Sequence, residues 1–152
     1  MKRALITGIS GFVGRHLREE LLRANWQVYG FDIRPAGEKV FVGDLSDRTA
    51  LTRAIADCQP DAVFHLAGII KSTDPQTYYT SNLFGTVNLL DAVMQMEKRP
   101  KVVLASSSAV YGLTKSARPI TERSPLRPVT EYAVSKVAQE TAALRYHYAF
   151  GL

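Results

Sequence analysis

The segment "EYAVSK" places two residues that could transfer a proton one helical turn apart. Tyr132 and Lys136 stand at positions i and i+4, which lie on one face of a helix. A nearby ammonium stabilises the phenolate form of a tyrosine, and such a tyrosine can donate or accept the proton that accompanies hydride transfer at a carbonyl. Taken alone the spacing is common, and an ordinary surface pair is the alternative interpretation.

Three consecutive hydroxyls, Ser106 to Ser108, follow the apolar run "KVVLA". Serine suits a strand interior poorly, but it suits the carboxyl end of a strand, where α/β sheets open onto their ligands. Two interpretations follow: the hydroxyls tie down loose backbone groups at a strand end, or one of them performs chemistry. The segment alone leaves both open.

The segment "TGISGFVG" spaces Gly8, Gly11 and Gly14 three residues apart, between an expected strand and an expected helix. The first glycine permits a tight turn, the second lets backbone amides approach a pyrophosphate, and the third packs the helix against the sheet. The amides and the positive end of the helix would then bind the phosphates. In this strand–turn–helix context the spacing predicts a dinucleotide-binding turn, and a glycine turn without a ligand is the weaker alternative.

Asp32 ends the expected second strand, "VYGFD", 18 positions after Gly14. A carboxylate at this place accepts hydrogen bonds from both hydroxyls of an adenosine ribose and repels a 2′-phosphate, which favours NAD over NADP. Arg34 lies two residues further along, and because a cation there could bind a 2′-phosphate, NADP is the alternative cofactor.

Strands and helices alternate along the whole chain, which predicts parallel βαβ units and one doubly wound α/β sheet of strand order 3-2-1-4-5. We therefore expect residues 1–152 to form a single dinucleotide-binding domain of Rossmann type. The expected strands cover residues 3–7, 27–32, 39–43, 61–68 and 101–107, and the expected helices cover residues 11–24, 48–59, 75–97 and 130–150.

Capping residues predict where the helices begin. Ser46 is expected to cap the helix before the fourth strand, and Asp74 followed by Pro75 is expected to open the next. That helix carries an apolar stripe at Leu83, Val87, Leu90 and Met94, with Phe84, Leu89 and Met96 off the stripe. A helix with apolar residues beyond one stripe packs against more than its own sheet, so we expect this helix to contact a second subunit in a homodimer. The alternative is that all of these apolar residues pack within the one chain.

Composition excludes several classes of protein. The formal charge is +5, but the 19 Lys and Arg residues are scattered, so a nucleic-acid partner is not indicated. No apolar run is long enough to span a membrane, and no signal peptide is recognisable, so we expect no membrane partner and a cytoplasmic location. The single cysteine, Cys58, lies on an apolar helix phase and is expected in the core. No Cys, His or Asp cluster has the spacing of a metal site.

Motifs from one end of the chain to the other form a single ordered series. They are "TGISGFVG", "FDIR", "GDL", "FHLAG", "SNLFGTVNLLDA", "SSSAVYG" and "EYAVSK". In this order and at these intervals the series resembles the extended short-chain dehydrogenase/reductase family, of NAD-dependent epimerase/dehydratase type, whose members modify nucleotide-sugars on a bound nicotinamide cofactor.

The resemblance implies roles for particular residues. Ser107 would hydrogen-bond the reacting oxygen, with Ser106 or Ser108 as alternatives; Tyr132 would be the acid and base; Lys136 would bind the cofactor ribose and tune the tyrosine. It also implies that His65 passes beside the cofactor. The implied cofactor-binding residues are Gly8, Ser10, Gly11, Phe12, Val13, Gly14, Asp32, Ile33, Arg34, Asp44, Leu45, Leu66, Ala67, Gly68, Tyr132 and Lys136.

Within the family, "RPVTEYAVSKVAQE" and "YHYAFGL" most resemble reductases of GDP-4-keto-6-deoxymannose. Nucleotide-sugar 4,6-dehydratases of this family carry an acidic pair after the strand-end hydroxyl. Ser108 and Ala109 stand at those positions here, which favours a reductase or an epimerase, although Ala109 also departs from many of the similar reductases.

In the family, a further strand and a substrate-binding part follow the point at which this sequence ends, so we expect the substrate-binding domain to be absent from this chain. Three hypotheses stand: a reductase of a GDP-4-keto-6-deoxy-hexose, a nucleotide-sugar 4-epimerase, and a cofactor-binding fragment or module without catalysis.

Overall fold

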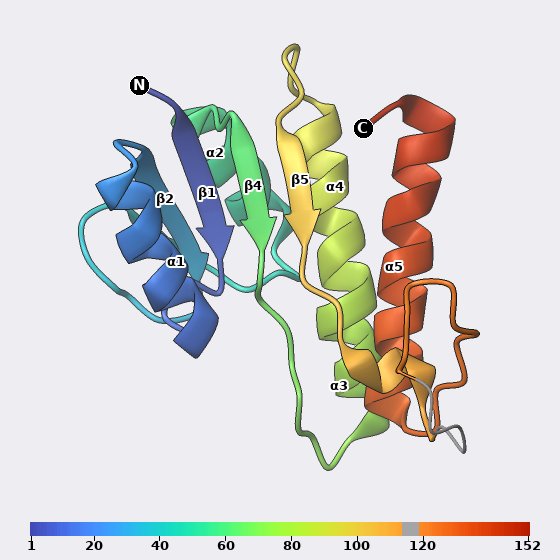
Figure 1. Ribbon diagram of the computed structural model, residues 1–152. Coiled ribbons are helices and arrows are strands. Elements are labelled where there is room, and N and C mark those ends of the chain that lie inside the picture. The colour runs from blue at the N-terminus through green and yellow to red at the C-terminus, as the bar shows by residue number, and fades with distance from the viewer. Residues whose placement is uncertain (114–118) are drawn as a thin grey trace.

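Five parallel strands form the central sheet. Their order is β3-β2-β1-β4-β5, which confirms the order predicted from the sequence. In Figure 1 the labelled strands point the same way, so their carboxyl ends lie together at the lower edge of the sheet. The strands are β1 (Arg3–Thr7), β2 (Gln27–Asp32), β3 (Val40–Val42), β4 (Ala62–His65) and β5 (Lys101–Leu104). The computed structural model describes residues 1–113 and 119–152.

Helices lie on both faces of the sheet, as a doubly wound fold requires. Helix α1 covers one face, α2 and α4 cover the other, and α5 lies beside α4 at the β5 edge (Figure 1). Within the described residues, no helix is both long and apolar enough to be a membrane span. The helical elements are α1 (Phe12–Arg23), α2 (Arg48–Cys58), α3 (Pro75–Tyr78), a π-helical segment (Tyr79–Phe84), α4 (Gly85–Met94), a 3-10 turn (Ser108–Tyr111) and α5 (Glu131–Phe150).

Alternate residues of the strands enter two separate hydrophobic cores. In β1, Ala4 and Ile6 face α1, while Leu5 packs with Val63 towards α2 and α4. Cys58 is fully buried in the second core, as expected. Burial raises the pKa of its thiol to about 12, so the thiol stays protonated and acts as a core residue.

One of the two expected helix caps is confirmed and the other is wrong. The Asp74 carboxylate accepts a hydrogen bond from the Gln76 amide at 3.1 Å, and Pro75 follows at the first helical position. Helix α2 is capped by Asp47, which accepts from the Ala50 amide at 2.9 Å, and not by Ser46. The reason is local: the Asp44 side chain accepts from the Ser46 amide at 2.8 Å, so Ser46 belongs to the preceding turn.

The helix expected over residues 75–97 is interrupted by the π-helical segment and ends at Met94. A π turn changes the phase of the helix, and the predicted stripe is therefore wrong in detail. Leu89, expected off the stripe, is fully buried, whereas Val87, expected on it, is half-buried. The fifth strand also ends earlier than expected, at Leu104, so the three serines follow it as a loop and the 3-10 turn.

Candidate functional site

The glycine turn after β1 brings three backbone segments into close contact. Gly8 has a φ of +73°, and a Cβ there would lie 2.8 Å from the amide nitrogen of Ala67 at the end of β4. A Cβ at Gly14 would lie 2.4 Å from the Gly8 carbonyl oxygen, so any side chain would push α1 away from the turn. The first and third glycines therefore occupy positions that tolerate no side chain.

The start of α1 presents unoccupied hydrogen-bond donors. The N-cap residue, Gly11, has no side chain that could accept from the first amides of the helix, and the first turn holds no acidic residue. The Ser10 hydroxyl oxygen is buried and has no hydrogen-bond partner among the described residues. Free amides, the positive helix end and an unsatisfied hydroxyl together fit the phosphate oxygens of a dinucleotide.

Asp32 is a buried carboxylate at the carboxyl end of β2, 7% exposed. One oxygen accepts from the Ser10 amide at 2.9 Å and the other from the Arg34 amide at 3.1 Å. Because each carboxylate oxygen can accept a second hydrogen bond, both oxygens remain able to bind ribose hydroxyls. The exposed Arg34 guanidinium lies 3.9 Å from the nearer oxygen.

A cleft of about 410 Å³ opens at the carboxyl ends of β1 to β4. Most of the predicted cofactor residues line it: Gly8, Gly11, Asp32, Ile33, Arg34, Asp44, Leu45, Leu66, Ala67 and Gly68. Sequence reasoning missed Phe31, Gly43 and Ile69, which adjoin predicted residues and could have been found by that adjacency. It also missed Ser81, although Ser81 begins the motif "SNLFGTVNLLDA" of the series.

The other predicted cofactor residues do not line this cleft. Phe12 and Val13 are exposed on the first turn of α1, and Gly14 is buried within it. Tyr132 and Lys136 lie on α5, and His65 lies beneath the cleft at 1% exposure rather than in it.

Lys136 reaches from α5 to the end of β5, where its ammonium donates to the Ala105 carbonyl at 2.7 Å. The side chain is buried, and burial lowers the pKa of Lys136 to about 8, with the Glu140 charge partly opposing this shift. Ser107 lies two residues beyond Ala105. The helix and the strand end thus bring Lys136 and the serine segment together.

The serine hydroxyls have different partners. Ser107 caps the 3-10 turn, its hydroxyl oxygen accepting from the Ala109 amide at 3.2 Å. Since that bond uses a lone pair, the hydroxyl proton stays available for a ligand. The interpretation that the serine hydroxyls tie down backbone groups is wrong for Ser106, whose hydroxyl donates to the Glu140 carboxylate. Sequence reasoning missed Glu140, which stands four residues after Lys136.

Tyr132 lies half-buried in the first turn of α5, one turn before Lys136. Its ring packs at 6.2 Å, between centroids, against the ring of Tyr78 from α3. The Tyr78 hydroxyl accepts from the Ser72 amide at 2.9 Å, which fixes that ring. Sequence reasoning missed Tyr78, because only the fold brings α3 against α5.

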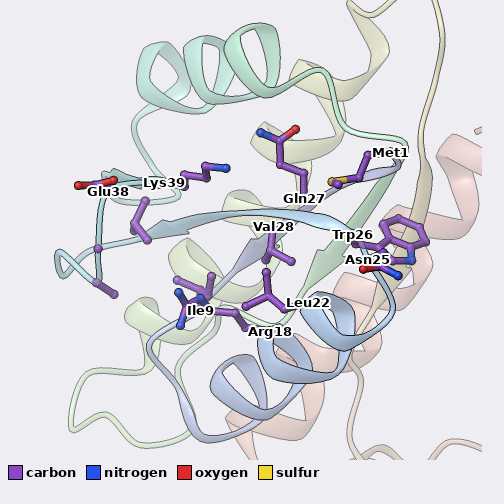
Figure 2. Close-up of a pocket in the computed structure, with 13 residues that line it drawn as sticks. Met1, Ile9, Arg18, Leu22, Asn25, Trp26, Gln27, Val28, Glu38 and Lys39 are labelled. Atoms are coloured by element: carbon purple, nitrogen blue, oxygen red, sulfur yellow. The ribbon is translucent and has the colours of Figure 1, made fainter.

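A larger hollow of about 710 Å³ lies between α1, β2 and residues 36–40. Figure 2 shows Leu22 and Val28 pointing towards each other there, with Arg18 close to Leu22 and with Glu38 and Lys39 on the segment before β3. Most of its lining precedes or begins β2 and β3, whereas ligands of open α/β sheets bind at the carboxyl ends of strands. None of the predicted site residues lines it, so the cleft beside Asp32 is the candidate site.

The five-stranded parallel sheet, with a glycine turn after its first strand and an acid at the end of its second, defines a Rossmann-type α/β protein. More narrowly, the chain belongs to the NAD dependent epimerase/dehydratase family, whose family model matches residues 4–152.

Three relatives illustrate the likeness. A GDP-mannose 4,6-dehydratase of Vibrio cholerae is 32% identical over 99% of this chain and 47% of its own length. A UDP-glucuronate 4-epimerase of Arabidopsis thaliana is 32% identical over 97% of this chain and 39% of its own length. The crystal structure of a Thermus thermophilus UDP-glucose 4-epimerase in complex with NAD is 34% identical, with a TM-score of 0.91 over 99% of this chain and 52% of that one. The chain thus spans about half the length of such relatives.

Proposed function

We propose that this chain binds NAD and belongs to an oxidoreductase of nucleotide-sugars in which Tyr132 moves the proton. The observation that carries the proposal is the convergence of two groups on one edge of the sheet. The cleft with Asp32 lies at the ends of β1 to β4, and Lys136 reaches the end of β5 beside Ser107. Membership of the family and the NAD-bound epimerase from Thermus thermophilus support the cofactor.

The residues around the cleft fit NAD. The free amides at the start of α1 and the Ser10 hydroxyl would bind the pyrophosphate, and Asp32 would accept from the adenosine ribose. The buried Asp32 carboxylate would repel a 2′-phosphate, so we propose NAD rather than NADP, with NADP as the alternative through Arg34. When bound, NAD supplies the site that gives or takes the hydride.

Three side chains of the chain would then act on the sugar carbonyl. The Ser107 proton is free to hydrogen-bond the reacting oxygen, and Tyr132 would give that oxygen its proton or remove it. Lys136 would hold the nicotinamide ribose and keep a positive charge beside the tyrosine. With a pKa of about 8, Lys136 is mostly charged at neutral pH.

The particular reaction we propose is reduction of a GDP-4-keto-6-deoxy-hexose. Loss of water, as in a dehydratase, needs an acid and a base beside the sugar, and Ser108 and Ala109 supply no carboxylate there. A 4-epimerase is the second candidate, supported by the epimerases among the structural relatives. A cofactor-binding module without turnover is the third.

The test uses a full-length form that carries the substrate-binding part, with NADH and GDP-4-keto-6-deoxymannose, following NADH absorbance and the sugar product. A reductase consumes one NADH for each ketone reduced. A 4-epimerase is detected instead with NAD and UDP-glucose, as the 4-epimer formed without net cofactor turnover. Cofactor binding with no product from either sugar supports the module, and absence of NAD binding overturns the proposal.

The role of Tyr132 is tested by Tyr132→Phe, which removes the phenol proton and keeps the ring. General acid–base catalysis contributes about 10²–10⁴-fold, so turnover of the full-length form should fall by that order while the NAD dissociation constant stays nearly unchanged. Tyr148→Phe, an exposed tyrosine of the same helix, is the matched control and should keep turnover. Near-normal turnover of Tyr132→Phe would contradict the assignment.

We also propose that the chain forms a homodimer through α4 and α5. Exposed or half-buried residues of α5 follow a spacing of i, i+3, i+7, i+10 and i+14, the seam of a helix pair. They are Val134, Val137, Thr141, Leu144 and Tyr148. Phe84, the last residue of the π-helical segment before α4, is 57% exposed, and that segment packs against α5.

A further inference from the structure

Six buried polar residues form a network of hydrogen bonds beneath the cleft, in which one link runs through the backbone carbonyl of Asn82. They come from β1, β4, the π-helical segment, α4 and α5, so the network joins five elements that are distant in sequence. A polar group without a hydrogen bond is costly in the interior, so the direction of most hydrogen bonds in the network can be deduced. The side-chain oxygen of Gln139 is the exception, because it is buried and has no partner among the described residues. The six residues, each at most 1% exposed, are Thr7, His65, Asn82, Thr86, Ser135 and Gln139.

The partners of Thr86 determine where the proton of His65 lies. The Thr86 hydroxyl has one proton, and its oxygen lies 2.7 Å from the Asn82 carbonyl, which can only accept. The two lone pairs of the hydroxyl oxygen then accept from the Gln139 amide at 2.8 Å and from Nε2 of His65 at 2.8 Å. His65 is therefore protonated on Nε2.

The other ring nitrogen is consistent with this tautomer. A neutral imidazole protonated on Nε2 accepts at Nδ1, and Nδ1 lies 2.6 Å from the Thr7 hydroxyl, which donates to it. The Thr7 oxygen in turn accepts from the Ala67 amide at 3.2 Å. Burial, with a smaller effect from the Lys136 charge, lowers the pKa of His65 to about 3, so the ring is neutral.

Asn82 extends the network to the cleft and to the catalytic helix. Its amide group donates to the Ile69 carbonyl at 3.0 Å, and its oxygen accepts from the Ile69 amide at 2.8 Å. The same amide nitrogen donates to the Ser135 hydroxyl at 3.0 Å, and Ser135 donates to the backbone carbonyl of Tyr132 at 2.7 Å. One network thus fixes both residues 67–69 and the start of α5.

We propose that His65 is a positioning residue: its neutral ring, protonated on Nε2, connects residues 67–69 of the cofactor cleft to the helix that carries Tyr132 and Lys136. His65 does not line the cleft and acts through Thr7 and Thr86. A change that breaks the ring's hydrogen bonds loosens the cleft wall and the catalytic helix together. The catalytic part of this inference rests on the proposed function, whereas the tautomer and the cleft wall do not.

The tautomer is tested on the unsubstituted chain by ¹⁵N NMR of the histidine rings at neutral pH. We expect His65 to show a protonated Nε2 and an unprotonated Nδ1, with the exposed His16 and His147 as reference signals. A proton on Nδ1, or on both nitrogens, would overturn the inference without bearing on NAD binding.

The positioning role is tested by Thr86→Val, which keeps the shape of the side chain and removes both acceptor lone pairs. We expect faster amide exchange at Ala67 and Ile69, and weaker NAD binding by about two- to thirty-fold, the range found for residues that couple sites through a network. Thr86→Ser restores the hydroxyl and should restore both readouts.

Thr80→Val is the matched control, because its hydroxyl also donates to the carbonyl four residues earlier, that of Gln76 at 3.1 Å, but lies exposed on the surface. A folded Thr86→Val chain with unchanged amide exchange and an unchanged NAD dissociation constant would overturn the role of His65. If Thr86→Val does not fold, the ¹⁵N NMR test is made on the unsubstituted chain and on the Thr86→Ser chain. A His65 ring that is not protonated on Nε2 alone, in either chain, overturns the inference. Failure of the unsubstituted chain to bind NAD would overturn the proposed function and leave the tautomer and exchange tests valid.

Discussion

At the scale of single residues, the cleft contains a buried carboxylate, Asp32, whose negative charge is not neutralised by a close cation. Asp32 is buried, and its hydrogen bonds come from two backbone amides, while the guanidinium of Arg34 stays mostly in solvent at 3.9 Å. A buried carboxylate with only a distant exposed cation keeps most of its repulsion for another anion. Asp32 should therefore discriminate between cofactors by charge and not only by hydrogen bonding.

Asp32→Asn should weaken this discrimination. The amide still hydrogen-bonds ribose hydroxyls, but it no longer repels a 2′-phosphate, so the ratio of NADP to NAD affinity should rise by about tenfold or more. Calorimetric titration with both cofactors measures the ratio. Asp44→Asn is the control: Asp44 also lines the cleft, yet its carboxylate is exposed and bonds the Ser46 amide, so the ratio should change less. An unsubstituted chain that binds NADP more tightly than NAD would contradict the argument.

The site residues that could be predicted from the sequence are those whose role depends only on residues close to them in the chain. Gly8 needs a positive φ and Asp32 ends a strand, and both conditions can be read from neighbouring residues. Glu140 and Tyr78 were missed because their contacts, with Ser106 and with Tyr132, join segments that only the tertiary structure brings together. The same holds for the tautomer of His65, which depends on Thr86 and Gln139 of two other helices.

At the scale of elements, the caps and the π-helical segment set the position of the catalytic helix. Helix α5 begins where the Thr130 hydroxyl oxygen accepts from the Ala133 amide at 3.1 Å, two residues before Tyr132. The strands and most helices followed from the period of apolar residues. The π turn could not be predicted from that period, because it is associated with the buried polar residues Asn82 and Thr86 and not with an apolar pattern.

Thr130→Ala should destabilise the start of α5. Loss of a threonine cap costs about 0.5–2 kcal/mol of the free energy of unfolding, and the first turn carrying Tyr132 should fray more than the rest of the helix. Urea denaturation measures the first effect, and amide exchange along α5 measures the second. Thr130→Ser should keep both near the original values. Equal stability of Thr130→Ala and the unsubstituted chain would show that tertiary contacts alone fix the start of the helix.

At the scale of the whole molecule, the pair of helices α4 and α5 has one face buried against the rest of the chain and one face exposed. Ala133, Lys136 and Gln139 of α5 are buried against the rest of the chain, whereas Val134 and Leu144 point away from it, 39% and 49% exposed. Apolar side chains that recur at helix-pair spacing on an exposed face commonly cover a partner. The expected two-fold contact would set α4 and α5 of one chain against the same helices of another.

Leu144→Glu should therefore convert a dimer to a monomer. A carboxylate within the seam would lose its water on association, and burying a charge without a partner at an interface is strongly unfavourable. Light scattering coupled to size-exclusion chromatography, over a range of concentrations, gives the mass of each form. Leu22→Glu is the matched control, because Leu22 is exposed to a similar extent, 47%, but lies on α1 across the sheet. A dimer that persists in Leu144→Glu, or that is lost to the same extent in Leu22→Glu, would contradict the proposed seam. An unsubstituted chain that stays monomeric at every concentration would contradict the dimer itself.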